Sequence, residues 1–220
     1  HMLKIVQKES KLATVITFAN VKGGSGKSTL CINMAAILIR SGYSVALLDS
    51  DQQKCSQDWI TGTKDRLLSK VEIIEPAEMV SVEDVEVDFL LIDTQGSLTK
   101  EMAQFLFQSS LIVTPCRVSR DDLVGQGWIE VFLKQSSQNV NKAPVLTVLN
   151  GVNKRSSILS HVIEQLKEDG IEVAETCISQ RVCFAETNVN KISVIGYNKQ
   201  ATEEIVDLTN EALKLIKSEA

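Results

Sequence analysis

A glycine-rich stretch between two lysines is the part of this sequence best suited to chemistry on a phosphate. It reads Lys22-Gly23-Gly24-Ser25-Gly26-Lys27-Ser28-Thr29 and lies between an apolar run and a helical pattern. Glycines let the backbone turn several N–H groups toward one anion, and the following helix adds the positive end of its dipole. In a loop of this kind, Lys27 reaches the β- and γ-phosphates and the Ser28 hydroxyl is a ligand of Mg²⁺. We therefore predict that residues 23–29 bind a nucleotide.

The loop departs from the usual pattern G-x-x-x-x-G-K-[ST] at its first position. Val21 stands where that pattern has a glycine, and the residue after it, Lys22, is a second lysine. The alternative is a flexible glycine turn with Lys22 as a solvated charge. The strand before the loop, the helix after it and the acidic motifs further along favour a nucleotide site.

Acidic residues follow two further apolar runs. Asp49 and Asp51 stand two residues apart at the end of one run, and Asp93 ends the run 89–92. Hydrolysis of a nucleotide with Mg²⁺ requires groups that hold the metal and a group that orients the attacking water. We assign Asp49 and Asp93, with Ser28, to the metal and Asp51 to the water. The alternative is an Asx turn in which Asp51 caps the next helix.

The elements expected around these groups place them along one edge of a sheet. Apolar runs alternate with helical patterns, which indicates an α/β fold with a mostly parallel, twisted β-sheet flanked by helices on both faces. In such folds ligands bind at the carboxyl ends of the strands. The expected strands are 12–19, 44–48, 71–74, 89–92, 111–114, 145–149 and 171–177, and the expected helices include 27–41, 121–135, 158–169 and 202–217.

Length and composition agree with one domain of this kind. The chain has 220 residues, of which 44% are hydrophobic and 5% aromatic, and its net charge is −5. Such a chain can bury an aliphatic core, and its overall charge does not indicate a nucleic-acid or membrane binder. The five cysteines lack C-x-x-C spacing, and neither an 18-residue apolar run nor a signal-peptide pattern occurs. We therefore expect a cytoplasmic protein.

The order of the motifs resembles that of the ParA/MinD group of deviant Walker A ATPases, most closely the small plasmid-partition ParA proteins of the ParF kind. The resemblance covers about the whole chain after Lys11. It implies a P-loop NTPase fold, ATP/ADP and Mg²⁺ as cofactors, and a sandwich dimer of two ATP-bound subunits. The residues that carry it are 22–29, 49–53, 88–97, and Pro115 with the helix expected from Asp122.

The resemblance also implies roles for single residues. Lys22 matches the signature lysine that reaches the nucleotide of the partner subunit. Lys27 matches the P-loop lysine, Ser28 and Thr29 match the hydroxyls near metal and phosphate, and Asp51 matches the acid needed for hydrolysis. The expected catalytic residues are therefore Lys22, Lys27 and Asp51. A lysine supplied by the neighbouring subunit makes dimerisation depend on the γ-phosphate.

Two positions depart from the family pattern. Gln52 replaces the proline of Asp-x-Asp-Pro-Gln, and Gln95 replaces the small residue or proline common after the Walker B aspartate. Both lie in loops expected to govern hydrolysis rate more than binding. The resemblance further places Asn150 and Asn153 near adenine, although Asn-Gly-Val-Asn is equally typical of a plain turn.

We interpret the chain as an ATP-dependent DNA segregation (plasmid partition) ATPase with weak basal activity. Its ATP-bound homodimer is expected to bind non-specific DNA of the nucleoid, and a ParB-like centromere-binding partner to stimulate hydrolysis. Residues 1–11 are interpreted as a tag scar and short N-terminal extension, and 12–220 as a single P-loop ATPase domain without an N-terminal helix-turn-helix. Contacts to DNA phosphates would be salt-sensitive, and the candidates are Lys154, Arg155, Arg181, Lys191 and Lys199.

Three alternatives remain open from the sequence. A MinD-like membrane regulator needs a basic amphipathic C-terminal helix, whereas 202–217 is acid-rich and patterned like a core-packed helix, so we expect no stable membrane anchor. An iron–sulfur carrier needs paired cysteines, and Cys116 has no clear companion. An ATPase that positions another cargo would share the same core, because cargo choice resides in the partner.

Overall fold

The computed structural model describes residues 12–76, 82–97, 99–119, 129, 131–132 and 143–219. The expected N-terminal extension, 1–11, lies outside these residues. So does nearly all of the helix expected over 121–135, including its start at Asp122.

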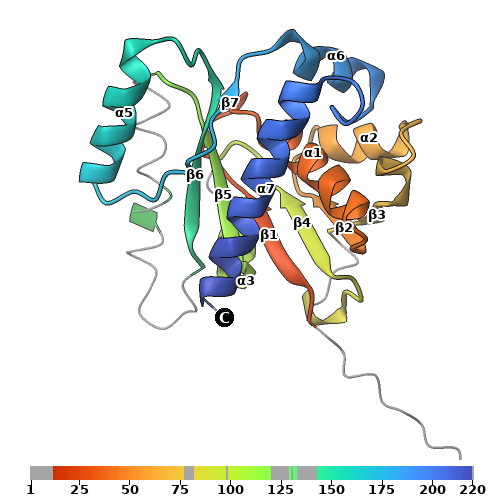
Figure 1. Cartoon of the computed structure of the whole chain (residues 1–220). Coiled ribbons are helices and arrows are strands. Elements are labelled where there is room, and N and C mark those ends of the chain that lie inside the picture. Colours follow the sequence, from red (N-terminus) through yellow and green to blue (C-terminus); the bar gives the residue numbers. More distant parts are fainter. Residues whose placement is uncertain are drawn as a thin grey trace, which may run out of the picture.

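A single parallel sheet runs through the molecule (Figure 1). Its strands follow the order β3-β2-β4-β1-β5-β6-β7, and each neighbouring pair is parallel. The predicted α/β fold is therefore confirmed. The strands are β1 (Thr14–Phe18), β2 (Val45–Asp49), β3 (Glu72–Ile74), β4 (Phe89–Asp93), β5 (Leu111–Cys116), β6 (Val145–Val152) and β7 (Ile178–Ser179).

Helices cover both faces of the sheet. One core cluster joins Ile16 and Phe18 of β1 to α1 and α7. A second cluster, on the other face, joins Val15 of the same strand to Phe105 of α3. The helices are α1 (Lys27–Arg40), α2 (Cys55–Thr61), α3 (Lys100–Gln108), α5 (Ser157–Glu168), α6 (Val182–Asn190) and α7 (Lys199–Glu219), and short 3₁₀ turns form η1 (Leu68–Lys70) and η2 (Val82–Asp84).

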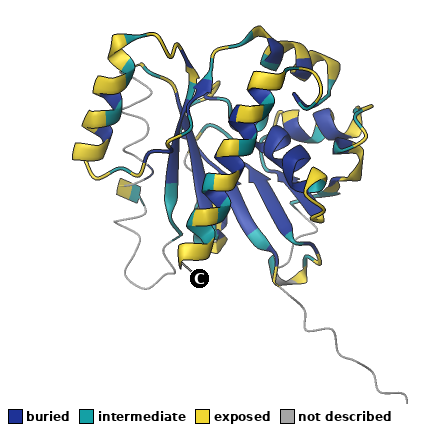
Figure 2. Cartoon of the chain, viewed as in Figure 1, coloured by how far each residue is buried: buried dark blue, intermediate teal, exposed yellow. Residues whose placement is uncertain are grey.

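The central strands are buried on both faces, which explains their near-continuous apolar runs. Every residue of β2 and β4 is buried, and Figure 2 shows the strands as mostly dark blue beneath helices with exposed outer faces. Strands with two covered faces need apolar side chains at every position. Their carboxyl ends meet at one edge of the sheet, where Asp49 is paired in register with Asp93.

The C-terminal helix packs against the core, as its pattern predicted. In α7 the side chains of Ala201, Ile205, Leu208 and Ala212 are all buried in the same cluster as α1. Its outward face carries acidic residues such as Glu203 and Asp207. The apolar face of α7 is thus used within the molecule.

The strand predicted over 171–177 is misplaced. In this stretch only Val173 forms an isolated bridge, to Thr147, and the strand itself is the two-residue β7 further on. The backbone N–H groups of Glu175 and Thr176 instead donate to the carboxylate of Glu211 on α7. A side chain thus takes the donors that a longer strand would have offered to its neighbour.

Candidate nucleotide-binding site

The glycine loop joins β1 to α1 and needs glycine at two positions. Gly24 and Gly26 have φ angles of 74° and 101°, a region that residues with a Cβ rarely adopt. A Cβ on Gly26 would also lie 2.0 Å from Nδ2 of Asn150. The carbonyl of Gly26 accepts from Leu30 N at 3.0 Å, so the loop leads directly into the first turn of α1.

Two asparagines hold this loop against neighbouring strands. Asn20 donates from Nδ2 to the carbonyl of Pro115 in β5 at 2.6 Å, and its Oδ1 accepts from Lys22 N at 2.9 Å. Asn150 of β6 donates from Nδ2 to the carbonyl of Ser25 at 2.7 Å. The loop conformation is therefore fixed by contacts to β5 and β6 as well as by its glycines.

The turn after β4 packs closely on the same loop. A Cβ on Gly96 would lie 2.8 Å from the backbone N of Gly23 and 3.1 Å from its Cα. Only glycine allows this approach of two backbones. The glycine loop and the turn that follows Asp93 are thus packed backbone against backbone.

Asp49 anchors the start of α2. It is 1% exposed, and its carboxylate accepts the N–H groups of Asp51, Ser56 and Gln57 at 2.9 to 3.0 Å. Burial raises the pKa of Asp49, although these three bonds and the nearby Lys54 oppose the shift. The alternative interpretation made Asp51 the cap of the next helix. In the structure Asp49, and not Asp51, accepts the N–H groups at the start of that helix.

Asp51 lies beside the loop and forms an Asx turn. Its Oδ1 accepts from Gln53 N at 2.9 Å, as the alternative interpretation of this motif predicted. The residue also lines a cleft together with Gly24 and Lys27 of the glycine loop. The turn holds the backbone and leaves the carboxylate at the cleft, so the two interpretations of Asp51 are compatible.

Asp93 is a buried carboxylate that its surroundings satisfy only in part. It is 1% exposed; Ser56 donates to its Oδ2, while its Oδ1 has no hydrogen-bond partner among the described residues. Burial raises the pKa of Asp93 to about 6, against hydrogen bonds from Ser28 and Ser56 and the charge of Lys27. Burial also lowers the pKa of the Lys27 amine, which Asp93 and Asp51 oppose.

This donor set fits Mg²⁺. An unpartnered carboxylate oxygen on Asp93 and the Ser28 hydroxyl are hard oxygen ligands of the type that Mg²⁺ takes. Among the described residues no cluster of three His, Cys, Asp or Glu side chains could hold a metal ion by itself. A cation here would complete its shell with phosphate oxygens and water, as Mg²⁺ does with nucleotides.

A cleft of about 490 Å³ opens over these groups. Of the predicted site residues it is lined by Gly23, Gly24, Gly26, Lys27, Ser28, Thr29, Asp51 and Asn150. Five predicted residues do not line the cleft: Lys22, Ser25, Asp49, Asp93 and Asn153. Lys22 and Ser25 still adjoin it within the glycine loop, and Asp49 and Asp93 adjoin it through their bonds to α2. The Oδ1 of Asn153 accepts from Arg155 N in an exposed turn, and Asn150 lies within β6 rather than after it.

Gln53, Cys55 and Gly96 also line the cleft, from the start of α2 and the turn after β4; Gln53 and Gly96 lie within the motifs 49–53 and 88–97. The rest of the lining was not predicted as part of a nucleotide site. It comes from the ends of β5 and β6 and from the segment 179–188, which had no motif to mark it; Arg181 was noted only as a DNA candidate. These residues are Arg117, Gly151, Ser179, Gln180, Arg181, Phe184, Ala185 and Asn188.

Most of the candidate DNA-binding cations are paired with carboxylates. Lys154 and Arg181 both contact Glu204, at 2.8 and 3.1 Å. Lys191 contacts Asp58 at 2.8 Å, and Lys199 contacts Glu203 at 3.8 Å. These charges are partly compensated within the chain, so the described surface does not present them as an isolated basic patch.

Comparison with known proteins agrees with this geometry. A family profile described as CobQ/CobB/MinD/ParA nucleotide binding domain matches residues 16–194. The maintenance of carboxysome distribution protein A of Halothiobacillus neapolitanus is 24% identical over 213 residues, which cover 93% of this chain and 98% of that protein.

Solved structures share the fold. A putative plasmid partition protein of Borrelia burgdorferi bound to AMPPNP superposes with a TM-score of 0.73 at 17% identity, covering 94% of this chain and all of that one. The septum site-determining protein MinD of Pyrococcus horikoshii, complexed with Mg-ADP, gives 0.68 at 17% identity, with coverages of 94% and 99%. At these identities the likeness establishes the fold.

Proposed function

This chain belongs to the CobQ/CobB/MinD/ParA family of nucleotide-binding domains and is a ParA/MinD-type ATPase, and we propose from this premise that it drives DNA segregation of the plasmid-partition kind. The observation that carries the proposal is Lys22 at the start of a glycine loop that leads into Lys27 and α1. A second lysine at this point has no role in an ordinary phosphate loop. Lys22 has a role if another subunit completes the nucleotide site, because Lys22 can then reach the nucleotide of that subunit.

The residues of the cleft divide the work of hydrolysis. Lys27 binds the β- and γ-phosphates, and the loop N–H groups of residues 23–29 face the same anion. Ser28 and Asp93 would hold Mg²⁺, with Asp49 in the outer shell, and the metal would neutralise phosphate charge. Asp51 orients the attacking water from its position at the cleft.

Lys22 links nucleotide state to assembly. Its backbone is held on both sides, because its N–H donates to Asn20 and its carbonyl accepts from the Lys27 amine at 3.4 Å. A triphosphate carries about four negative charges, more than one lysine and one metal ion compensate. In this proposal Lys22 of each subunit compensates the γ-phosphate of the other, and hydrolysis releases the dimer.

The variant Lys22→Ala tests this role. We expect it to bind ATP within about threefold of the wild type, because Lys27 and the loop remain. Partner-stimulated hydrolysis should fall to the basal rate. As the matched control, Lys27→Ala should lose nucleotide binding itself. Normal stimulated hydrolysis by Lys22→Ala, with partner and DNA present, would overturn the proposed role.

DNA binding in different nucleotide states tests the function as a whole. Binding should require ATP, be absent with ADP or without nucleotide, and weaken steeply between about 50 and 200 mM salt, because phosphate contacts release counterions. The basal rate of ATP hydrolysis is expected to be weak and should rise with a ParB-like partner. In the bound nucleotide, the adenine would lie near Asn150. Binding to anionic liposomes in place of DNA would contradict partition.

A second candidate is the positioning of a protein assembly. It is favoured by the relative from Halothiobacillus neapolitanus, whose name refers to carboxysome distribution and which this chain matches over nearly its full length. A MinD-like membrane cycle is less well supported, because the apolar face of α7 is buried in the core. Among the described residues, no helix combines the length and apolar character needed to cross a bilayer. Loss of a plasmid, without dispersal of a protein assembly, on deletion of the gene would favour partition.

A further inference from the structure

A third buried carboxylate lies away from the glycine loop. Among the described residues the acidic side chains classed as buried are Asp49, Asp93 and Glu204. The first two belong to the nucleotide site. Glu204 belongs to α7, is 7% exposed and does not line the cleft. Nothing in the proposed mechanism explains why a carboxylate is buried there.

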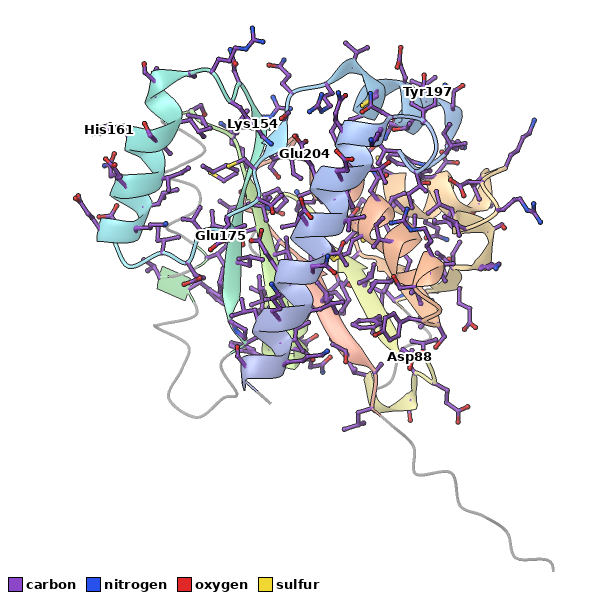
Figure 3. The ribbon with its side chains drawn as sticks, viewed as in Figure 1. Asp88, Lys154, His161, Glu175, Tyr197 and Glu204 are labelled. Carbon is purple, nitrogen blue, oxygen red and sulfur yellow. The ribbon has the colours of Figure 1, made fainter. Side chains whose placement is uncertain are left out.

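Three residues from two segments, 154 and 179–181, donate to this one carboxylate. Ser179, at the end of β7, donates from its N at 3.0 Å and from its hydroxyl at 2.6 Å. Lys154, after β6, donates at 2.8 Å, and Arg181, at the start of α6, donates from Nη2 at 3.1 Å. Figure 3 shows Lys154 and Glu204 facing each other where α7 passes the ends of these strands. Burial alone would raise the pKa of Glu204, but these bonds lower it to about 2.

Two of the three donors are walls of the nucleotide cleft. Ser179 and Arg181 both line it, and α6, which begins just after Arg181, contributes Phe184, Ala185 and Asn188. Glu204 therefore binds two residues of this wall without lining the cleft itself. Lys154 shares the same carboxylate oxygen but does not line the cleft.

Arg181 keeps donor capacity for a ligand. Its guanidinium has five N–H groups, and Nη2 bonds to Glu204. Nε is buried and has no partner among the described residues, so donation to a ligand in the cleft falls to the outer Nη groups. Since the glycine loop takes the phosphates, the wall 179–188 is left for the ribose and base of a nucleotide. Ribose hydroxyls and base nitrogens are acceptors for such a group.

We infer that Glu204 is a positioning residue for the nucleotide: from α7 it holds Ser179 and Arg181 at the cleft, so that Arg181 donates to the nucleoside part of bound ATP or ADP. The inference rests on the proposed nucleotide binding. It assigns to the C-terminal helix a part in ligand affinity, although no residue of that helix lines the cleft.

The test measures ATP and ADP affinity of the full chain by calorimetry in the presence of Mg²⁺. Glu204→Gln keeps the shape and one acceptor but loses the charge that orients Arg181. We expect the dissociation constants of ATP and ADP to rise together by about tenfold, because the lost contact is to the part that the two nucleotides share. Arg181→Ala should have the same effect, and the double variant should be no worse than Arg181→Ala alone.

Two matched controls separate positioning from general weakening of the fold. Lys154→Ala breaks the other ion pair of Glu204 and should leave both affinities within twofold. Glu211→Gln removes a similar α7 carboxylate that holds Glu175 and Thr176 away from the cleft, and should also leave them within twofold. Circular dichroism would confirm that every variant is folded at the assay temperature.

Each result decides between the proposals. A folded wild type that binds neither nucleotide removes the proposed function, and this inference with it. If the wild type binds but Glu204→Gln behaves like Glu211→Gln, or its effect adds to that of Arg181→Ala, only the positioning role fails. A loss confined to ATP would contradict the nucleoside assignment, because it would place the contact at the γ-phosphate.

Discussion

Asp93 and Glu204 are both buried carboxylates at the carboxyl edge of one sheet, and they differ in how their charge is compensated. Asp93 receives hydroxyl groups and the charge of Lys27, but one of its oxygens has no partner among the described residues. Glu204 receives two cations, a hydroxyl and a backbone N–H. Their pKa values accordingly move in opposite directions, to about 6 and about 2.

The difference separates a binding group from a structural one. A buried charge without full compensation costs stability, and such groups persist where a ligand completes them. A saturated carboxylate has little left to offer a ligand and acts on its neighbours instead. The region around Asp93 is therefore expected to affect activity more than stability, and the region around Glu204 to affect stability directly.

The largest expected effect is on activity, at Asp93. Asp93→Asn keeps the side-chain shape but removes the charge that would hold Mg²⁺, so ATP hydrolysis should fall on the order of 100-fold. The unfolding temperature of the nucleotide-free protein should not fall, because the removed charge was buried and incompletely paired. Steady-state ATPase assays and thermal unfolding measure the two quantities. Near-normal hydrolysis, or unfolding several degrees lower, would remove the contrast with Glu204.

At Glu204 the expected effect is on stability. Glu204→Gln should lower the free energy of unfolding by about 2 kcal/mol, because two cations lose their buried partner while Ser179 keeps an acceptor. Glu203→Gln is the control on the adjacent residue: its partner Lys199 is 3.8 Å away and both side chains are mostly exposed, so the change should stay below about 0.5 kcal/mol. Urea denaturation at neutral pH gives both values. Equal effects at the two positions would contradict the structural role of Glu204.

Acid titration sharpens the same comparison. The pKa of Glu204 is lowered from 4.5 to about 2 on folding, so its contribution to stability is complete above pH 4.5 and is lost as the pH falls toward 2. The stability difference between the wild type and Glu204→Gln should therefore narrow across this range. Urea unfolding of both proteins at several pH values measures it. A difference that stays constant down to pH 3 would show that the ionised carboxylate is not what stabilises the wall.

The two regions also differ in what the sequence reveals. The glycine loop and the acidic residues after β2 and β4 are short contiguous motifs, each at the end of an apolar run, so one-dimensional patterns predicted where they would meet. The fold followed from the same alternation of runs and helical patterns. The sequence indicates that Gly26 lies in a turn, but it does not indicate that Gly26 packs against Asn150.

Glu204 left no such signal, because its partners lie 23 to 50 residues away in sequence. An acidic residue in an amphipathic helix looks the same whether it faces water or a buried arginine. The helices α3 and α6 were not among the expected helices for a related reason: each is 9 residues long, too short for a clear 3.6-residue period. The prediction of a strand at 171–177 failed because Glu211 of α7 accepts the backbone N–H groups of Glu175 and Thr176. No local sequence pattern encodes that contact.

The smallest expected effect is at an exposed ion pair between α2, whose Ser56 bonds to Asp93, and the end of α6, which begins just after the Arg181 that bonds to Glu204. Lys191 follows α6 and contacts Asp58 of α2 at 2.8 Å, but the Asp58 side chain is 70% exposed. Asp58→Asn should change the free energy of unfolding by less than about 0.5 kcal/mol, because water and salt screen the pair. Urea denaturation at low and high salt tests this, and high salt should erase what difference there is. A loss near that of Glu204→Gln would mean that burial is not what separates strong from weak ion pairs in this chain, since the two pairs have similar distances.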